Sequence, residues 1–396
     1  MGCPTSTGDI WPAVEEAVEA AHEVLGHNLH GPCDGLPRAA AWGYPEPYTR
    51  DLLISSLAAL VTGRQDLMQS LRAVLETLAR NQSSLGLIPS LAHARDNLGA
   101  SDTTPLFLIA VALYRKVTGE ARFLREPVER ALLWMEYRSS ECREIVDQQP
   151  TTDWRDEIWV PGYGLYVNTL VYIYLKLLGR EERAARLHER MHRFAVTTDG
   201  DGPSNGRRGL LLTDRPYFAF WAFKEFGSDR FDLMGNSLAI LSGLAGTKLT
   251  EDMISWVEAE CARLRESGDL KGELPPCLFP YLRKGDRDYT RRVERLNPPG
   301  SYGNGGIWPF VSGFYVAALV AAGRQELAEE KLAALTDLVR QGKNPDLRFG
   351  FNEWHQAQDG LPKGNDWQTW SAALYIYAAQ CVRRGSTPLF DELRKR

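Results

Sequence analysis

The segment from Phe349 to Ser371, FGFNEWHQAQDGLPKGNDWQTWS, combines one acid with several amides and three indoles. The acid is Glu353, and His355 follows it closely. A second polar and aromatic cluster comes after a loop rich in Gly, Pro and Lys: Trp367, Gln368 and Trp370. Indole faces can stack on the C–H groups of a pyranose ring, while carboxylates and amides bind its hydroxyls. The composition favours sugar binding, and the alternative is a surface turn with ordinary tryptophans.

A second acidic segment, TTDWRDEIWVPGYG, places Asp153 and Asp156 on either side of Trp154 and Arg155. Carboxyl groups among aromatic side chains are expected to have raised pKa values, as a general acid requires. Together with Glu353, this segment supplies the two carboxylates from different loops that glycoside hydrolysis needs. A solvated acidic turn is the alternative. The sequence leaves the choice between Asp153 and Asp156 open.

Three further loops carry groups that could bind a sugar. Asp51, in AAWGYPEPYTRDLL, either complements a helix dipole or binds hydroxyls, and Asp102 has the position of a helix N-cap. Paired glycines before Trp308 would let the backbone approach a ligand closely. The candidate substrate-binding residues are Trp42, Tyr48, Arg50, Asp51, Asp102, Asp153, Trp154, Asn304, Gly305, Trp308, His355, Trp367, Gln368 and Trp370.

Helical periodicity recurs along the whole chain, and no convincing strand pattern interrupts it. The connections alternate between short turns that contain glycine and loops of about twenty residues or more. The predicted helices cover residues 11–26, 49–62, 65–81, 103–117, 121–138, 164–178, 180–194, 234–245, 249–266, 308–322, 324–340 and 367–384.

The helices that follow long loops are apolar on nearly every face, as in FVSGFYVAALVAA, whereas the intervening helices are amphipathic. A helix that is apolar all round is buried. Six buried helices that alternate with six surface helices predict an all-α fold, the (α/α)6 barrel, as a single domain over residues 1–396. Its six long loops would gather at the end where the inner helices begin, which is where we expect the functional site.

The composition excludes several classes of function. A net charge of −5 gives no general attraction to nucleic acid or to anionic membranes, and no apolar run reaches the roughly 18 residues needed to span a bilayer. The six cysteines form no CxxC pair, so we expect reduced thiols in a cytoplasmic protein. No metal-binding or nucleotide-binding motif is present, and we expect no cofactor. The sequence leaves a homodimer possible.

Several segments resemble the neutral/alkaline invertases, glycoside hydrolase family 100. SYGNGGIWPF is similar to that family's NGG-x-WP region, and NEWHQAQDGLPKGNDWQTWS is similar to its segment ending in Q-x-W-S. YTRDLL and TDWRDEIWVPGYG match in placement, so the resemblance extends over residues 45–380. Family 63 α-glucosidases are similar more loosely. The resemblance implies that Glu353 is the general base and Asp156 the general acid, with Asp153 as the alternative.

The resulting hypothesis is an inverting glycoside hydrolase for a small soluble α-glucoside. Sucrose is the leading substrate, and other α-glucosyl disaccharides or glucosylglycerate-type compounds follow. A sugar isomerase or epimerase on the same barrel is one alternative, although only His93 and His355 lie in the relevant loops. A non-catalytic carbohydrate-binding barrel is another, and it predicts that Asp156 and Glu353 lie far apart or point outward.

Overall fold

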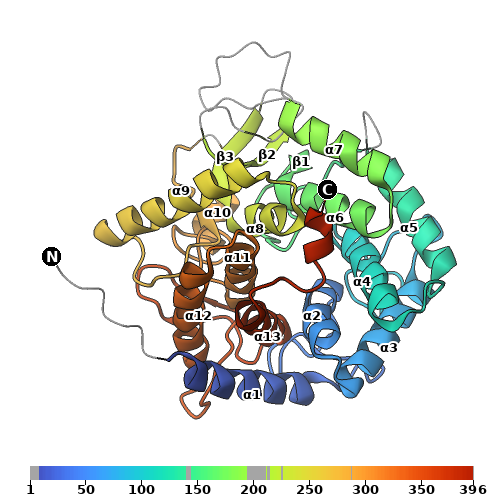
Figure 1. Ribbon diagram of the computed structural model, residues 1–396, viewed down its shortest axis with the longest axis horizontal. Helices are drawn as coiled ribbons and strands as arrows, with labels where there is room; N and C mark the ends of the chain where they lie inside the picture. The colour runs from blue at the N-terminus through green and yellow to red at the C-terminus, as the bar shows by residue number, and fades with distance from the viewer. Residues whose placement is uncertain are drawn as a thin grey trace.

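The computed structural model describes residues 9–139, 144–193, 211, 215–223, 226–286 and 288–395. Within them the chain is mostly helical (Figure 1). The α-helices are α1 (Trp11–Asn28), α2 (Thr49–Thr62), α3 (Gln65–Asn81), α4 (Thr103–Thr118), α5 (Arg125–Tyr137), α6 (Leu165–Leu177), α7 (Glu181–Arg193), α8 (Leu233–Ser242), α9 (Thr247–Glu266), α10 (Arg291–Leu296), α11 (Pro309–Ala321), α12 (Gln325–Arg340) and α13 (Thr369–Arg384).

Six of these described helices form a closed inner ring: α2, α4, α6, α8, α11 and α13. Each packs against the next, and α13 packs back against α2, which closes the ring (Figure 1). Their sequences explain their position, because α11 is buried from Pro309 to Val320 and α13 is buried at nearly every residue. A helix without a polar face is stable only when protein surrounds it.

The amphipathic helices lie outside this ring. Helices α3, α5, α7 and α12 pack against the inner helices that precede them, while α1 contacts α12 and α13 (Figure 1). The short turns between partners end in left-handed residues, such as Gly63 after α2 and Gly119 after α4. Glycine adopts this conformation without the steric penalty of a Cβ atom. Each predicted helix has a counterpart in the structure. Residue 194, the last residue of the predicted helix 180–194, lies outside the described residues.

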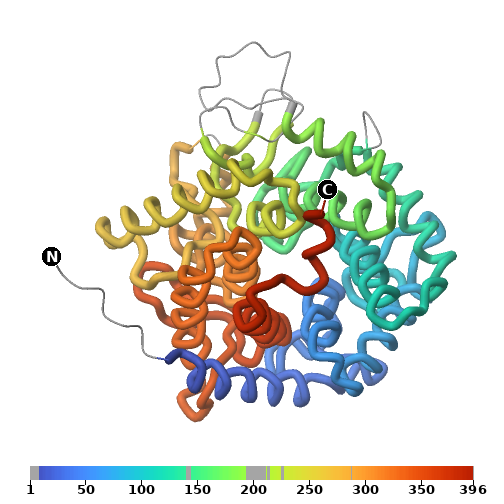
Figure 2. Tube along the Cα trace, viewed as in Figure 1, coloured from blue at the N-terminus to red at the C-terminus, as the bar shows by residue number. Residues whose placement is uncertain are grey.

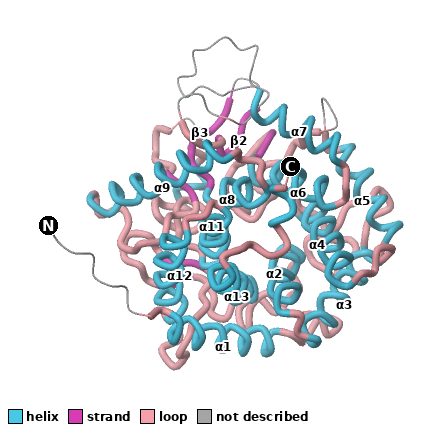
Figure 3. The backbone as a smooth tube through the Cα atoms, in the orientation of Figure 1, coloured by secondary structure: helices cyan, strands magenta, loops and turns pink. Residues whose placement is uncertain are grey.

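The prediction of a chain without strands was wrong. A four-stranded antiparallel sheet follows the order β1 (Tyr163–Gly164), β2 (Ala219–Phe223), β3 (Phe226–Asp232) and β4 (Leu278–Phe279), as Figure 3 shows in magenta. A second pair, β5 (Trp354–His355) and β6 (Pro362–Lys363), forms a small hairpin. The strands lie in the long loops, so they shape the end of the ring at which the inner helices begin.

The C-terminal segment covers the opposite end of the ring. A 3₁₀ helix, η1 (Asp391–Arg394), contacts α6 and α8, and Figure 2 shows this red segment crossing over from α13. Arg394 Nη1 donates to the carbonyl of Leu241 at 2.9 Å, near the C-terminus of α8. None of the described helices combines the length and apolar character needed to cross a lipid bilayer.

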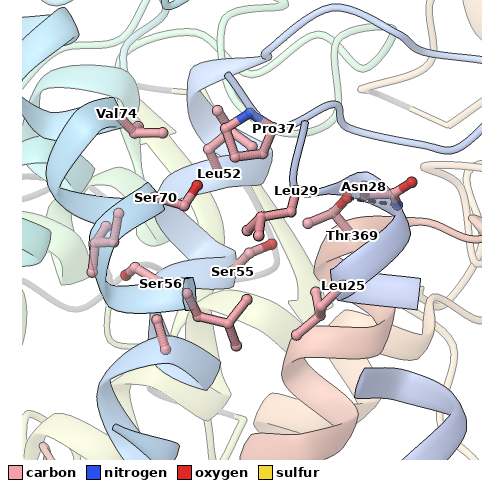
Figure 4. Close-up of a pocket in the computed structure, with 13 residues that line it drawn as sticks. Leu25, Asn28, Leu29, Pro37, Leu52, Ser55, Ser56, Ser70, Val74 and Thr369 are labelled. Carbon is pink, nitrogen blue, oxygen red and sulfur yellow. Dashed lines mark hydrogen bonds between the residues drawn. The ribbon is translucent and has the colours of Figure 1, made fainter. Parts of the chain in front are cut away.

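Helix α1 is fixed to the start of α13 by buried hydrogen bonds. Asn28 Nδ2 donates to Thr369 Oγ1 at 3.0 Å, as Figure 4 shows, and to the carbonyl of Trp367 at 2.8 Å. A cavity of about 50 Å³ lies beside this contact, between α1, α2 and α3, with Ser55 and Ser56 in its wall. These contacts position the N-terminal turn of α13, which reaches the candidate site.

Candidate active site

A pocket of about 230 Å³ lies at the end of the ring where the inner helices begin. Its wall combines acids, aromatic rings, one amide and one guanidinium group from several long loops and helix N-termini. The lining residues are Tyr44, Tyr48, Arg50, Asp51, Trp154, Asp156, Tyr302, Trp308, Glu353, Gln368 and Trp370. Three buried polar atoms in this wall have no partner among the described residues: Trp154 Nε1, Trp370 Nε1 and Gln368 Oε1. These two N–H donors and one acceptor are buried within the wall and unsatisfied there.

Asp156 and Glu353 face this pocket from two different loops. Arg50 Nη1 donates to Asp156 Oδ1 at 3.3 Å. The Asp156 side chain is 56% exposed, so solvent and a ligand can reach it. Protein nonetheless surrounds the carboxyl group on several sides, and this desolvation raises the pKa of Asp156 to about 6 despite the opposing effect of Arg50. A carboxyl group with this pKa can carry a proton near neutral pH.

Glu353 is only 6% exposed and is held against the loop that follows the β5–β6 hairpin. The Asn365 amide donates to Glu353 Oε2 at 3.2 Å, and the Glu353 amide donates to the Asn365 carbonyl at 2.9 Å. Gly364 makes this contact possible, because its φ is +70° and an added Cβ would collide with Oε2. Burial raises the pKa of Glu353 to about 7, with Asp156 adding to the rise and Lys343 opposing it.

Arg50 is the one cation among the described lining residues, and its orientation is fixed from behind. Asp102 is fully buried and accepts from Arg50 Nε at 2.5 Å and from Nη2 at 3.1 Å. This bidentate pair leaves Nη1 directed at Asp156. Beside it, burial raises the pKa of Asp51 to about 7. Arg50 thus lies among the carboxyl groups of Asp51, Asp102 and Asp156, of which Asp51 and Asp156 line the pocket.

Asp153, the alternative acid, lies outside the pocket lining. Its side chain is 2% exposed, and Oδ1 accepts from the Arg155 amide at 2.8 Å while Oδ2 accepts from Gln148 Nε2 at 3.2 Å. The buried Arg155 guanidinium lies 3.8 Å from Asp153 and also bonds to Asp232, which caps α8 by accepting from the Met234 amide. Asp153 belongs to a buried ionic cluster that joins two loops.

We expect Arg155→Met to destabilise the protein by about 3–5 kcal/mol, because it leaves Asp153 and Asp232 buried without their cation. Denaturant unfolding followed by circular dichroism measures this loss. The matched control is Arg292→Met, since Arg292 pairs with Glu157 at the surface and should leave the midpoint of unfolding nearly unchanged. Equal losses in the two variants would contradict the structural role of the cluster.

Other predicted binding residues also lie outside the pocket lining. Trp42 is 58% exposed and packs on Trp367, with ring centroids 5.3 Å apart, in a cluster with His27. The sequence places both tryptophans at the ends of long loops, but it does not reveal that their indole rings pack against each other. Asp102 likewise contributes through Arg50 rather than directly.

The Asn304–Gly305 pair has a packing role. The fully buried Asn304 side chain accepts from the Leu282 amide at 2.7 Å and donates to the carbonyls of Leu282 and Asn297, each at 2.9 Å. Gly305 has a φ of +101°, and an added Cβ would collide with the Tyr281 ring. His355 is not among the lining residues of this pocket and lines another one. None of these three residues lines the candidate pocket, so their predicted substrate contacts stay predictions.

Tyr44 and Tyr302 line the pocket but were not among the predicted site residues. Burial raises the pKa of Tyr44 to about 12, so its hydroxyl keeps its proton. Tyr302 has a φ of +42°, and its carbonyl accepts from Trp308 Nε1 at 3.0 Å. Two signals could have indicated them: tyrosine beside proline in GYPEPY, and tyrosine before the glycines of YGNGG.

Comparison with protein families agrees with the resemblance in the second part of the chain. The family model for alkaline and neutral invertases matches residues 226–384, which contain Glu353 but not Asp156. A probable chloroplastic alkaline/neutral invertase A of Arabidopsis thaliana is 27% identical over 158 residues, 39% of this chain and 23% of that protein. Cytosolic invertase 1 of Oryza sativa subsp. japonica is 28% identical over 38% of this chain and 25% of that protein. The matched region therefore spans about a quarter of these relatives.

Solved structures share the fold over nearly the whole chain. A GH63 mannosylglycerate hydrolase from Thermus thermophilus, in complex with Tris and D-glycerate, has a TM-score of 0.63 at 14% identity, covering 91% of this chain and 99% of that one. A glycosidase variant in complex with glucose has a TM-score of 0.64 at 15% identity, covering 96% and 99%. The chain thus resembles the alkaline and neutral invertases in sequence and GH63 glycosidases in fold.

Proposed function

We propose that the closed ring is an (α/α)6 barrel and that the protein is an inverting glycoside hydrolase for a small α-glucoside. One observation carries the proposal: Asp156 and Glu353, from separate loops, line the same pocket of about 230 Å³. Each has a pKa raised into the range where a carboxyl group exchanges protons near neutral pH. The similarity to invertases and the fold shared with glycosidases support the same class of reaction.

In this mechanism Asp156 protonates the glycosidic oxygen while Glu353 removes a proton from the attacking water. Arg50, bound to Asp102 from behind, orients Asp156. Trp308 and Trp370 give the sugar ring an apolar wall, with ring centroids 5.9 Å apart. Attack from the face opposite the leaving group inverts the anomeric centre.

The charges in the pocket favour a neutral leaving group. Among the described lining residues the only cation is Arg50, and its guanidinium group already forms ion pairs with Asp102 and Asp156. An anionic leaving group such as glycerate would meet three carboxyl groups and no free cation there. Sucrose is therefore our first substrate, ahead of glucosylglycerate-type compounds.

The pocket gives less support to the rival functions. No histidine is present among its described lining residues, whereas the proton transfers of an isomerase would need such a group in the pocket. A binding protein without catalysis would not need two carboxyl groups with pKa values near neutrality on opposite loops. Hydrolysis is the activity that uses both acids.

We expect kcat/KM to follow a bell-shaped pH profile with its maximum between about pH 6 and 7. Glu353, with a pKa of about 7, must lose its proton, so activity falls as the pH decreases below that range. Asp156, with a pKa of about 6, must keep its proton, so activity falls as the pH rises above the same range. Initial rates in buffers of constant ionic strength measure the profile. A maximum outside about pH 5–8 would contradict these roles.

A substrate panel tests the proposed function directly. Purified protein is incubated separately with sucrose, trehalose, maltose, glucosylglycerate and free glucose, and the monosaccharides present are separated by chromatography. We expect sucrose to give equal amounts of glucose and fructose. Conversion of free glucose into another hexose, without cleavage of any glucoside, would favour the isomerase instead.

A further inference from the structure

A second pocket, of about 340 Å³, lies between the β5–β6 hairpin, α12 and the loop that follows α9. It is larger than the candidate active site and shares no lining residue with it. Its wall includes His355 and Leu361 from the hairpin, Leu338 from α12 and Lys271 from the loop. The chemistry of these side chains determines which ligand the wall can recognise.

The buried ring of His355 is the most informative group in this pocket. Its Nδ1 lies 3.3 Å from the carbonyl oxygen of Gly360, which can only accept, so Nδ1 carries the proton and donates. Its Nε2 is then an acceptor, and it has no hydrogen-bond partner among the described residues. Burial lowers the pKa of His355 to about 4, so the ring is neutral. A buried acceptor without a donor is costly, and a ligand hydroxyl group would remove that cost.

The other polar groups of the wall restrict the ligand further. Asp337 and Gln341 make no side-chain hydrogen bond within the described part of the chain, so both offer acceptors. Lys271 Nζ is partly engaged, because it donates to the carbonyl of Asp359 at 2.9 Å. With Glu273 and Asp359 also in the wall, carboxylates outnumber the single ammonium group. An anion would be repelled, while a neutral ligand with several hydroxyl donors would be bound.

We propose that this pocket is a second binding site, specific for a small neutral polyhydroxy compound such as a monosaccharide or a polyol. Hydroxyl groups would donate to His355 Nε2 and to the acceptors of α12, while Ile307 and Leu338 contact the C–H faces. The site is distinct from the candidate active site and does not depend on the proposed hydrolysis. It is nevertheless joined to it, since the His355 backbone pairs with Ile307 at 2.8 and 2.9 Å, and Trp308 follows directly.

Imidazole nitrogen NMR tests this proposal at the atom concerned. The protein is labelled with ¹⁵N-histidine, and the Nε2 signal of His355 is assigned among the seven histidines by its loss in His355→Phe. D-Glucose and glycerol are then titrated separately. We expect a saturable upfield shift of the Nε2 signal with at least one of them, because an unprotonated ring nitrogen shifts in that direction when it accepts a hydrogen bond.

Two variants separate the pockets. Ala334→Trp should fill the second pocket and abolish the shift, and Gln341→Trp, at an exposed position on the same rim, serves if the first variant fails to fold. Asp51→Asn alters the candidate active site and should leave the shift in place. No shift with either compound would overturn the proposal, as would a shift that survives pocket filling or disappears in Asp51→Asn. A response to methylammonium alone would refute the ligand class.

Discussion

Glu353→Gln is expected to lower kcat for sucrose by about 10²–10⁴-fold while the fold stays intact. Glutamine keeps the length of the side chain and can still accept the Asn365 amide hydrogen bond, but it cannot remove a proton from water. We expect the fold to be retained because Gly364 packs closely against the side chain of residue 353, and glutamine has nearly the same shape as glutamate. Steady-state rates and thermal unfolding of the same preparations provide the measurement.

Asp346→Asn is the matched control for Glu353→Gln. Asp346 belongs to the same long loop, is exposed, and lies outside the pocket lining, so its neutralisation should leave kcat within a factor of two to three. Added azide offers a further test, because a small nucleophile that needs no deprotonation should restore turnover in Glu353→Gln. Near-normal hydrolysis by that variant would remove Glu353 from the mechanism.

Asp156→Asn is expected to cost about 10²–10⁴-fold in kcat for sucrose and far less for α-glucosyl fluoride. Sucrose needs a proton on its leaving oxygen, whereas fluoride departs without one, so the defect should depend on the leaving group. The ratio of the two rates, compared with wild type, measures the role of the acid. Arg50 would retain its bidentate bond to Asp102 in this variant, so the pocket should keep its shape.

Asp153→Asn separates the two neighbouring acids. Because Asp153 is buried against Arg155 and Gln148, this change should lower stability and affect both substrates alike. Glu157→Gln weakens only a surface pair with Arg292, so it should change neither the stability nor the rates with the two substrates. A defect selective for sucrose in Asp153→Asn, with normal rates in Asp156→Asn, would reverse the assignment of the acid.

The helical architecture could be predicted because each inner helix has its own signal, an apolar run such as SAALYIYAAQCV with a glycine turn after it. The sheet could not. Strands β1 and β4 are two residues long, too short for any period, and Ser228 and Arg230 in β3 are buried by contacts with Asp288. When a loop distant in sequence covers the polar face of a strand, burial no longer follows the alternation of polar and apolar residues, and the strand cannot be recognised from that alternation.

The loops that form the candidate site could be predicted from the sequence, but the pocket that each side chain lines could not. Glu353, Asp156 and Trp370 reach one pocket, as their positions before or at inner helices indicated. His355 is two residues from Glu353 yet lines another pocket, and its backbone pairs with Ile307. Such pairings depend on residues far apart in the chain, which a single sequence does not reveal.

The central claim is an inverting mechanism with Glu353 as the base, and the anomer released first tests it most directly. Proton NMR is recorded within the first minutes of sucrose hydrolysis, before mutarotation equilibrates the glucose anomers. We predict that β-glucose accumulates first in wild type and that Glu353→Gln releases neither anomer at a comparable rate. Initial release of α-glucose would show a retaining reaction and would contradict the roles proposed for Asp156 and Glu353.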